Sequence, residues 1–163
     1  MSVTLSRIGG TFARMKQEQR TGLVTYVTAG DPNLERSAQI LRALDRAGAD
    51  VIEVGVPFSD PLADGPAIQR ATERALASGA TLSGILDMLE RVRPALSVPL
   101  VLFTYANPLL RMGIDTFGRR AAQAGIDGVL VLDLPIEETA EFREAMAIRG
   151  IDIIFLLSPT TTP

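Results

Sequence analysis

A three-residue pattern, Gly-X-Asp, constrains the fold of this chain more than any other feature of its sequence. Its copies are Gly48-Ala49-Asp50, Gly125-Ile126-Asp127 and Gly150-Ile151-Asp152, and an apolar run follows each. A glycine just past a helix adopts the left-handed conformation without a steric penalty from a Cβ atom, so the chain can turn directly into a strand. We therefore expect three equivalent corners, each of which ends a helix and starts a strand.

Five short apolar runs predict strands, at residues 23–27, 51–56, 98–104, 128–132 and 153–157. Runs of this kind, rich in β-branched and large aliphatic residues, are typical of parallel strands that are buried on both faces. Amphipathic segments between the runs predict helices at 34–47, 67–77, 82–93 and 116–124. Asp31-Pro32 is expected to supply the N-cap and the first residue of the first of these helices, and Asp115 to cap the last.

Alternating strands and helices are compatible with an open, doubly wound sheet or with a closed (β/α)8 barrel of the TIM type. A complete barrel needs eight strands and about 250 residues, whereas this chain has 163 residues and five predicted strands. The pattern alone leaves an open sheet and a barrel truncated after about five strands as equal alternatives. Residues 1–163 are expected to form one domain, with an extra N-terminal helix over about 4–18 that covers the bottom of a barrel or the edge of a sheet.

Composition excludes several classes of function. The net charge of −3 makes nucleic acid an unlikely partner, and the apolar runs are far shorter than the roughly 20 residues that span a membrane. The chain has no cysteine and no histidine, which excludes disulfides, thiolate or imidazole metal ligands and histidine-dependent triads. Because the N-terminus lacks the apolar region of a signal peptide, we expect a cytoplasmic protein.

Glu53 is the first candidate acid/base. It lies in the middle of the second predicted strand, and the two-residue period of a strand places it on the same face as residues 51 and 55. A carboxylate that is buried without a partner either binds one or has its pKa raised. The alternative is a structural salt bridge, but no Lys or Arg lies within the five predicted strands.

Two further acids, Asp60 and Asp64, follow this strand in the loop 57–66, which contains three prolines. The prolines restrict the loop, so its carboxylates can be held in place at low entropic cost, which suits electrostatic catalysis. The carboxyl ends of the strands are also where barrel active sites are built. As alternatives, each aspartate could simply accept hydrogen bonds from nearby N–H groups. A divalent metal site is conceivable, although the spacing matches no calcium loop.

Polar residues also follow the other predicted strands: Thr28 with Asp31, Tyr105 with Asn107, Asp133 before Leu134 and Pro135, and Ser158. If the strands are parallel, all of these residues fall on one rim and outline a functional face, although each alone is typical of a turn or cap. Apolar and aromatic residues could line the same face or pack in the core: Tyr26, Phe103, Leu130, Leu132 and Phe155.

The segment from Glu53 to Gln69 closely resembles the signature of the tryptophan synthase alpha subunit family. The resemblance continues at residues 26–32, 105–108 and 133–135 and covers the first three-fifths of the family's chain. It implies a (β/α)8 barrel that cleaves indole-3-glycerol phosphate to indole and glyceraldehyde 3-phosphate by a retro-aldol reaction. It also implies that no metal or organic cofactor is used, and that the partner is a pyridoxal-phosphate beta subunit in an αββα complex.

The resemblance also implies roles for individual residues. Glu53 would be the acid/base for the glycerol hydroxyl and for C3 of the ring, and Asp64 would accept a hydrogen bond from the indole N–H. Residues expected to line or support the indole pocket are Tyr26, Phe103, Leu130, Leu132 and Tyr105. Residues expected to face the beta subunit are Asp60, Pro61, Asn107 and Pro135.

The family's mobile loop after strand six and its phosphate-binding strands seven and eight have no counterpart in these 163 residues. We therefore expect the chain by itself to be feebly active at best, with strand five as a poorly covered edge. Two alternatives stay open: a non-catalytic fragment or partner-binding module that keeps the beta-facing loops, and another phosphate-binding barrel enzyme.

Overall fold

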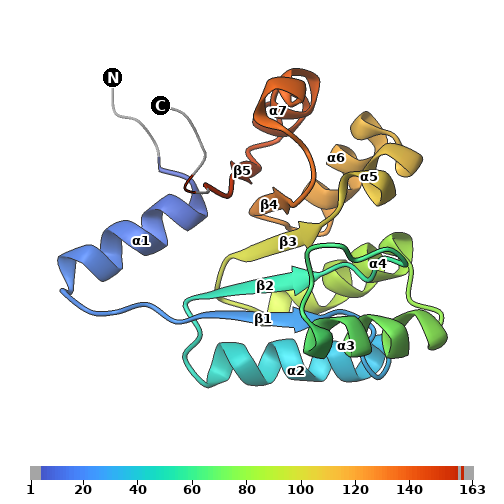
Figure 1. Ribbon diagram of the computed structural model, residues 1–163. Coiled ribbons are helices and arrows are strands. Elements are labelled where there is room, and N and C mark those ends of the chain that lie inside the picture. The colour runs from blue at the N-terminus through green and yellow to red at the C-terminus, as the bar shows by residue number, and fades with distance from the viewer. Residues whose placement is uncertain (1–4, 158, 160–163) are drawn as a thin grey trace.

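The computed structural model describes residues 5–157 and 159 and shows one parallel sheet with alternating helices (Figure 1). The elements, in chain order, are α1 (Arg7–Gln17), β1 (Val24–Thr28), α2 (Leu34–Arg46), β2 (Val51–Gly55), α3 (Pro66–Ala77), α4 (Leu82–Val92), η1 (Arg93–Ala95), β3 (Leu100–Thr104), α5 (Ala106–Met112), α6 (Ile114–Gln123), β4 (Gly128–Val131), η2 (Ile136–Glu138), α7 (Ala140–Ala147) and β5 (Asp152–Ile154).

The strand order decides between the two folds that the sequence allows. Each strand pairs in parallel with the next one along the chain, in the order β1-β2-β3-β4-β5. A doubly wound sheet instead reverses its strand order at a switch point and carries helices on both faces. The unbroken order is that of the first five strands of a (β/α)8 barrel, which confirms the barrel prediction.

Most of the apolar core lies between the convex face of the sheet and its helices. Ile52, Val54 and Leu102 point to that side and are fully buried, together with helix residues such as Leu86 and Phe117. The concave face, which is the barrel interior, carries a smaller buried cluster of Val51, Val101 and Leu130. Helices therefore hold the sheet from outside, and the inner face is left for other uses.

Helix α1 covers the bottom of the barrel, at the amino ends of the strands (Figure 1). Its Ile8 packs against the inner apolar cluster and approaches Gly128, where an added Cβ atom would lie 2.6 Å from Ile8 Cδ1. Ser6, the N-cap of α1, donates a hydrogen bond from its hydroxyl to Asp152 of β5. The predicted helix over 4–18 is thus present as Arg7–Gln17, and residue 4 lies outside the described residues.

The three predicted corners are present. Gly48, Gly125 and Gly150 each follow a helix with a positive φ, of +94°, +71° and +67°. A side chain at any of these positions would be strained, which explains the repeated glycine.

In two of the three copies, the aspartate of the pattern holds the start of the preceding strand, whereas Asp152 of the third accepts from the Ser6 hydroxyl. Oδ2 of Asp50 accepts a hydrogen bond from the N–H of Leu23 at 2.8 Å, just before β1. Oδ2 of Asp127 accepts one from the N–H of Leu100 at 2.8 Å, at the start of β3. Because the carboxylates bridge neighbouring strands at their amino ends, the repeat fixes the register there.

Both predicted caps are wrong. Helix α2 is capped by Asn33, whose side chain accepts from the N–H of Arg36 at 2.9 Å, while Asp31 pairs with Arg74 of α3. Helix α6 starts at Ile114, so Asp115 lies inside its first turn and pairs with arginines. Arginines hold both aspartates: Arg74 pairs with Asp31, and Arg119 and Arg149 pair with Asp115. These ion pairs compete with capping for the carboxylates, and Arg74 and Arg149 are too distant in sequence for the local pattern to reveal them.

The last strand is shorter and earlier than predicted. It comprises Asp152–Ile154, and Leu156 and Leu157 beyond it are 62% and 79% exposed. Ser158, the polar residue expected at this strand end, lies outside the described residues. In the described part of the chain, no helix is both long and apolar enough to cross a membrane.

Candidate functional site

Glu53 lies on the concave face of the sheet, at the centre of β2. Its register neighbours are Tyr26 on β1 and Val101 on β3. The side chain is partly buried, and this burial raises the pKa of its carboxyl group. Among the described residues the ion pairs involve other acids, so the alternative of a structural salt bridge at Glu53 is excluded for that part of the chain.

Asp64 lies in the loop between β2 and α3, two residues before α3 begins with Pro66. The side-chain amide of Gln69, in the first turns of α3, donates to the Asp64 carbonyl at 2.8 Å and ties the loop to the helix. Partial burial raises the pKa of the Asp64 carboxyl, and a hydrogen bond from the Tyr105 hydroxyl opposes that rise. Both candidate acids are thus partly desolvated.

Aromatic rings flank Glu53 on the concave face. Tyr26 and Phe103 meet edge to face, with ring centroids 5.3 Å apart and an interplanar angle of 81°. Gly55 makes this possible, because a Cβ atom at position 55 would lie 2.0 Å from the Tyr26 hydroxyl oxygen. Burial raises the pKa of Tyr26, and the nearby charges of Asp64 and Glu53 add to the rise.

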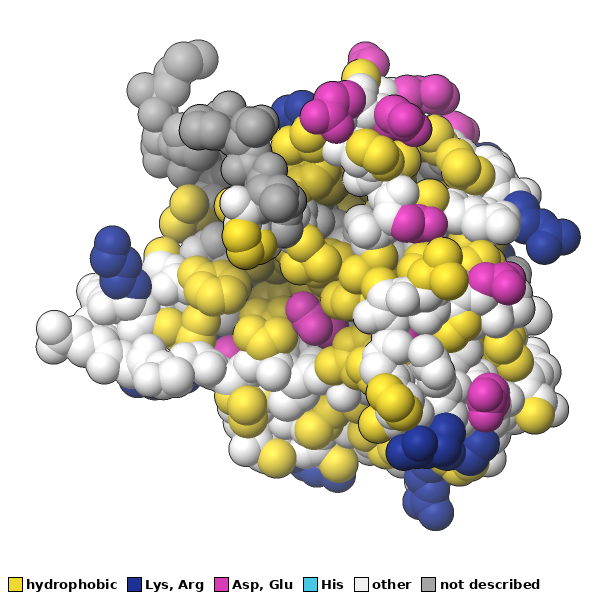
Figure 2. All heavy atoms as spheres, viewed as in Figure 1, with side chains coloured by type: hydrophobic (Ala, Val, Ile, Leu, Met, Phe, Trp, Pro, Cys, Tyr) yellow, Lys and Arg dark blue, Asp and Glu magenta, His cyan; other side chains and the backbone are white. Residues whose placement is uncertain are grey.

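The aliphatic part of the predicted pocket lies next to these rings. Leu130 is the register neighbour of Phe103 and is 3% exposed, while Leu132 packs partly buried against the same cluster. The structure therefore brings the predicted pocket residues Tyr26, Phe103, Leu130 and Leu132 onto one face with Glu53. Figure 2 shows acidic atoms surrounded by hydrophobic ones near the middle of this view.

Three contributors were not recognisable as site residues in the sequence. The ring of Phe58 packs against that of Tyr105, with centroids 5.2 Å apart, and the Ala63 N–H donates to the Tyr105 hydroxyl at 3.1 Å. Gly55 makes room for Tyr26. Only the alternation that places Gly55 beside Glu53 could have indicated it, since Phe58 and Ala63 act through contacts across the fold.

The residues expected to face a partner lie on loops at the carboxyl ends of successive strands. Asp60 and Asn107 are exposed after β2 and β3, Pro135 is exposed after β4, and Pro61 is partly buried. Beside them Leu62 is 96% exposed. A cavity of about 360 Å³ lies under this part of the loop, between it and α3.

Two other polar rim residues are structural. The carboxylate of Asp133 accepts a hydrogen bond from the N–H of Ala106 at 2.6 Å, at the start of α5. Asp31 accepts two hydrogen bonds from the guanidinium of Arg74, at 2.8 and 2.7 Å. Among the described residues, no group of three or more acids could hold a metal ion.

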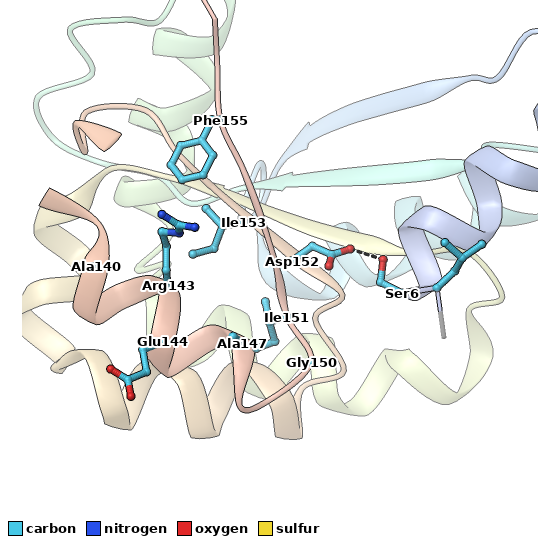
Figure 3. Close-up of a pocket in the computed structure, with 11 residues that line it drawn as sticks. Ser6, Ala140, Arg143, Glu144, Ala147, Gly150, Ile151, Asp152, Ile153 and Phe155 are labelled. Atoms are coloured by element: carbon cyan, nitrogen blue, oxygen red, sulfur yellow. Dashed lines mark hydrogen bonds between the residues drawn. The ribbon is translucent and has the colours of Figure 1, made fainter. Parts of the chain in front are cut away.

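A larger cavity, of about 970 Å³, lies away from these acids, between α7, β5 and the start of α1 (Figure 3). Ile153 and Phe155 line it from the strand side, and Arg143 and Glu144 line it from α7. In the described part of the chain β5 has a strand partner on one side, β4. This cavity therefore belongs to the uncovered edge of the sheet and not to the acidic face.

Fold and site together define a class: a β/α barrel with two partly desolvated acids that have no cationic partner among the described residues, one on the concave face of a strand and one in the loop at its carboxyl end. Comparison with known proteins narrows the class. A family model described as "Tryptophan synthase alpha chain" matches residues 12–163. The chain belongs to this family.

Individual relatives agree. The chain is 54% identical over 157 residues to the tryptophan synthase alpha chain of Geobacter sulfurreducens, covering 96% of this chain and 60% of the relative. It is 54% identical over 159 residues to that of Burkholderia thailandensis, covering 97% and 59%. The chain thus spans about 60% of the length of the curated relatives it matches.

Solved structures show the same fold. Subunit alpha of tryptophan synthase from Legionella pneumophila is 40% identical with a TM-score of 0.93, over 98% of this chain and 61% of that one. The tryptophan synthase complex from Pyrococcus furiosus matches with 42% identity and a TM-score of 0.82, over 86% and 58%.

Proposed function

We propose that this chain supplies the catalytic acids for the retro-aldol cleavage of indole-3-glycerol phosphate to indole and glyceraldehyde 3-phosphate. The observation that carries the proposal is the placement of two acids without a cationic partner among the described residues: Glu53 lies on the concave face of β2, and Asp64 lies in the loop at the carboxyl end of that strand. Membership of the tryptophan synthase alpha chain family supports the choice of reaction.

In this proposal Glu53 acts as the acid/base. In its protonated form Glu53 delivers a proton to C3 of the ring, which gives a cationic indolenine tautomer and leaves Glu53 as a carboxylate. Glu53 removes the proton of the glycerol hydroxyl next to the ring, the C–C bond to C3 breaks, and the hydroxyl carbon becomes the aldehyde. The electron pair of the broken bond neutralises the ring and releases indole. Burial raises the pKa of Glu53, which brings it closer to neutral pH, where a group can both accept and donate a proton.

Asp64 has an electrostatic role in the proposal. Its carboxylate accepts a hydrogen bond from the indole N–H as positive charge develops on that nitrogen. This contact strengthens in the transition state more than in the bound substrate, so it accelerates the cleavage step. The rings of Tyr26 and Phe103, with Leu130 and Leu132, give the flat apolar surface against which an indole ring would pack.

We also propose that the rim carrying Asp60, Pro61, Asn107 and Pro135 binds a tryptophan synthase beta subunit. Exposure of Leu62 on the same loop supports this, since an apolar side chain that is open to solvent gains free energy when an interface buries it. The proposal includes no cofactor in this chain, because pyridoxal phosphate belongs to the beta subunit. The comparisons do not favour a non-catalytic module.

The test uses a complete barrel, made by joining residues 1–163 to the unmatched C-terminal part of the Geobacter sulfurreducens relative. We expect Glu53→Gln to lower kcat for indole-3-glycerol phosphate about 10²- to 10⁴-fold, the usual contribution of an acid/base. We expect Asp64→Asn to lower kcat about 10²- to 10³-fold, with a smaller change in ligand affinity. Binding of a beta subunit should be nearly unchanged by Glu53→Gln.

The control is Glu35→Gln, which removes an exposed carboxylate from the first turn of α2. It should leave cleavage unchanged. Unchanged cleavage in Glu53→Gln would remove this residue from the mechanism. If the folded, unsubstituted barrel failed to bind indole propanol phosphate, another barrel chemistry would be favoured.

A further inference from the structure

Tyr105 occupies a position between two parts of the candidate site. It follows β3 directly and is the N-cap of α5, and its side chain is only 5% exposed. Its ring packs against that of Phe58, in the loop that carries Asp64. Tyr105 thus fastens the loop after β2 to the end of β3, although 40 or more residues separate the two segments.

The hydroxyl of Tyr105 has a defined direction. Its oxygen accepts a hydrogen bond from the Ala63 N–H at 3.1 Å. A phenol has a single proton to donate. Because the contact with Ala63 uses the hydroxyl as an acceptor, that proton is available to the carboxyl group of Asp64, the next residue along the loop. The hydroxyl therefore holds the backbone immediately before Asp64, and it lies close enough to the Asp64 carboxyl to affect its pKa.

We propose that Tyr105 is a positioning residue that fixes the Asp64 carboxylate, through one hydroxyl that accepts from the Ala63 N–H and donates to Asp64. Its consequence for catalysis rests on the function proposed for Asp64. A carboxylate that must face the indole nitrogen in the transition state gains from being fixed and ionised beforehand. Tyr105→Phe keeps the ring packed against Phe58 and removes only the hydroxyl.

The contact has a consequence for the titration of both partners. Burial raises the pKa of Asp64, and the hydrogen bond from Tyr105 lowers it, so removal of the hydroxyl should raise the pKa of Asp64 further. In the reverse direction, burial and the Asp64 charge raise the pKa of Tyr105. Removal of that charge should lower the pKa of Tyr105.

The first experiment uses the 163-residue chain, which has two tyrosines and no tryptophan. Tyr26→Phe leaves Tyr105 as the single tyrosine, and its ionisation is followed by ultraviolet absorbance while far-ultraviolet circular dichroism monitors folding. In this background we expect Asp64→Asn to shift the Tyr105 midpoint to lower pH. The matched control is Asp60→Asn on the same loop, whose carboxylate accepts from Ser59 instead, and it should leave the midpoint in place.

The second experiment follows the Asp64 carboxyl directly by NMR in chains labelled with ¹³C at aspartate. We expect Tyr105→Phe to raise the Asp64 midpoint, and Tyr26→Phe to change it less. An Asp64 midpoint that is the same with and without the Tyr105 hydroxyl would overturn the proposal. So would a Tyr105 midpoint that is insensitive to Asp64→Asn.

The kinetic consequence is measured in the completed barrel. We expect Tyr105→Phe to lower kcat more than it raises KM and to move the acid limb of the kcat profile to higher pH, because Asp64 protonates earlier. A purely structural role would lower the amount of folded enzyme without moving the limb. If the barrel does not cleave the substrate at all, the proposed function fails, while the two titrations still decide the role of Tyr105.

Discussion

At the scale of single residues, the shape of the concave face depends on a glycine, which has no side chain. Gly55 comes two residues after Glu53 on the same face of β2, and the Tyr26 hydroxyl occupies the space above it. A larger residue at position 55 would push this ring away from Phe103 and from the acids. The small residue therefore sets the shape of the surface on which a planar ring could lie.

This predicts a cost for Gly55→Ala. The added Cβ atom would lie 2.0 Å from the hydroxyl oxygen and 2.5 Å from the ring carbon that carries it, so the ring must move. Overpacking of this kind lowers the free energy of unfolding by about 1–3 kcal/mol, which urea unfolding would measure. Gly65→Ala is the control, because no atom lies within 4 Å of the added Cβ there. Equal effects at the two positions would contradict the argument.

Individual residues were predictable where local period or charge fixes them. The alternation of β2 correctly places Glu53 on the inner face. Phe103 and Leu130, which could line one face or pack in the core, are register neighbours on that face. The packing of Phe58 on Tyr105 was not predictable, since it joins segments that meet only when β2 and β3 pair. The misplaced caps at Asp31 and Asp115 have the same cause, because arginines from other helices or turns engage both side chains.

At the scale of elements, the starts of β1 and β3 are each held by an acid that immediately precedes the next strand. Asp50 is buried, and the Arg20 guanidinium and the Leu23 N–H lower its pKa to about 2. A carboxyl whose pKa is lower in the folded than in the unfolded chain stabilises the fold at pH values above its unfolded pKa, about 3.9. That stability is lost as the pH falls through the folded value.

We therefore expect Asp50→Asn to lower the free energy of unfolding at pH 6. The gap between the parent chain and this variant should narrow as the pH falls from about 4 toward 2, where the parent carboxyl is also protonated. Urea unfolding at a series of pH values measures both effects. The exposed loop variant Asp60→Asn is the control and should differ little from the parent throughout. A gap that stays constant down to pH 2 would show that the ionised form of Asp50 does not matter.

The sequence predicted where the strands and helices lie more accurately than where they end. The first four strands are present within one or two residues of the apolar runs, because buried parallel strands need such runs. The fifth is shorter, and its predicted second half holds the exposed Leu156 and Leu157. Apolar character alone does not extend a strand past the end of its partner, and β4, the strand with which β5 pairs, ends at Val131.

At the scale of the whole molecule, the sheet has an exposed edge at β5. Strand β5 pairs with β4, and exposed leucines follow it beside a cavity of about 970 Å³. An edge with unpaired backbone groups and apolar side chains is a template for association with another chain. The 163-residue chain is therefore expected to self-associate through this edge at micromolar concentrations and above.

The expectation is tested by sedimentation velocity with the double variant Leu156→Lys and Leu157→Lys. Charges placed beside an edge oppose pairing, so this variant should stay monomeric at concentrations where the parent associates. Leu110→Lys, which changes a leucine that is 58% exposed on α5, is the control and should associate like the parent. Association of all three chains alike would place the contact elsewhere.

The barrel assignment itself needed the whole molecule. Spacing alone could not separate a barrel from a doubly wound sheet, because both alternate strands and helices. The separation came from pairing order, which depends on contacts between segments far apart in sequence.

The division of the sheet into a convex face with many buried residues and a concave face with few has a consequence for how such a protein changes over generations. Side chains that pack between the helices and the sheet, such as Ile52 and Leu102, tolerate few substitutions, because a cavity at these positions destabilises the fold. Those proposed to meet the ligand, such as Tyr26 and Leu132, are partly open to solvent. Substitutions on the concave face can therefore change ligand specificity during evolution, while the fold stays the same.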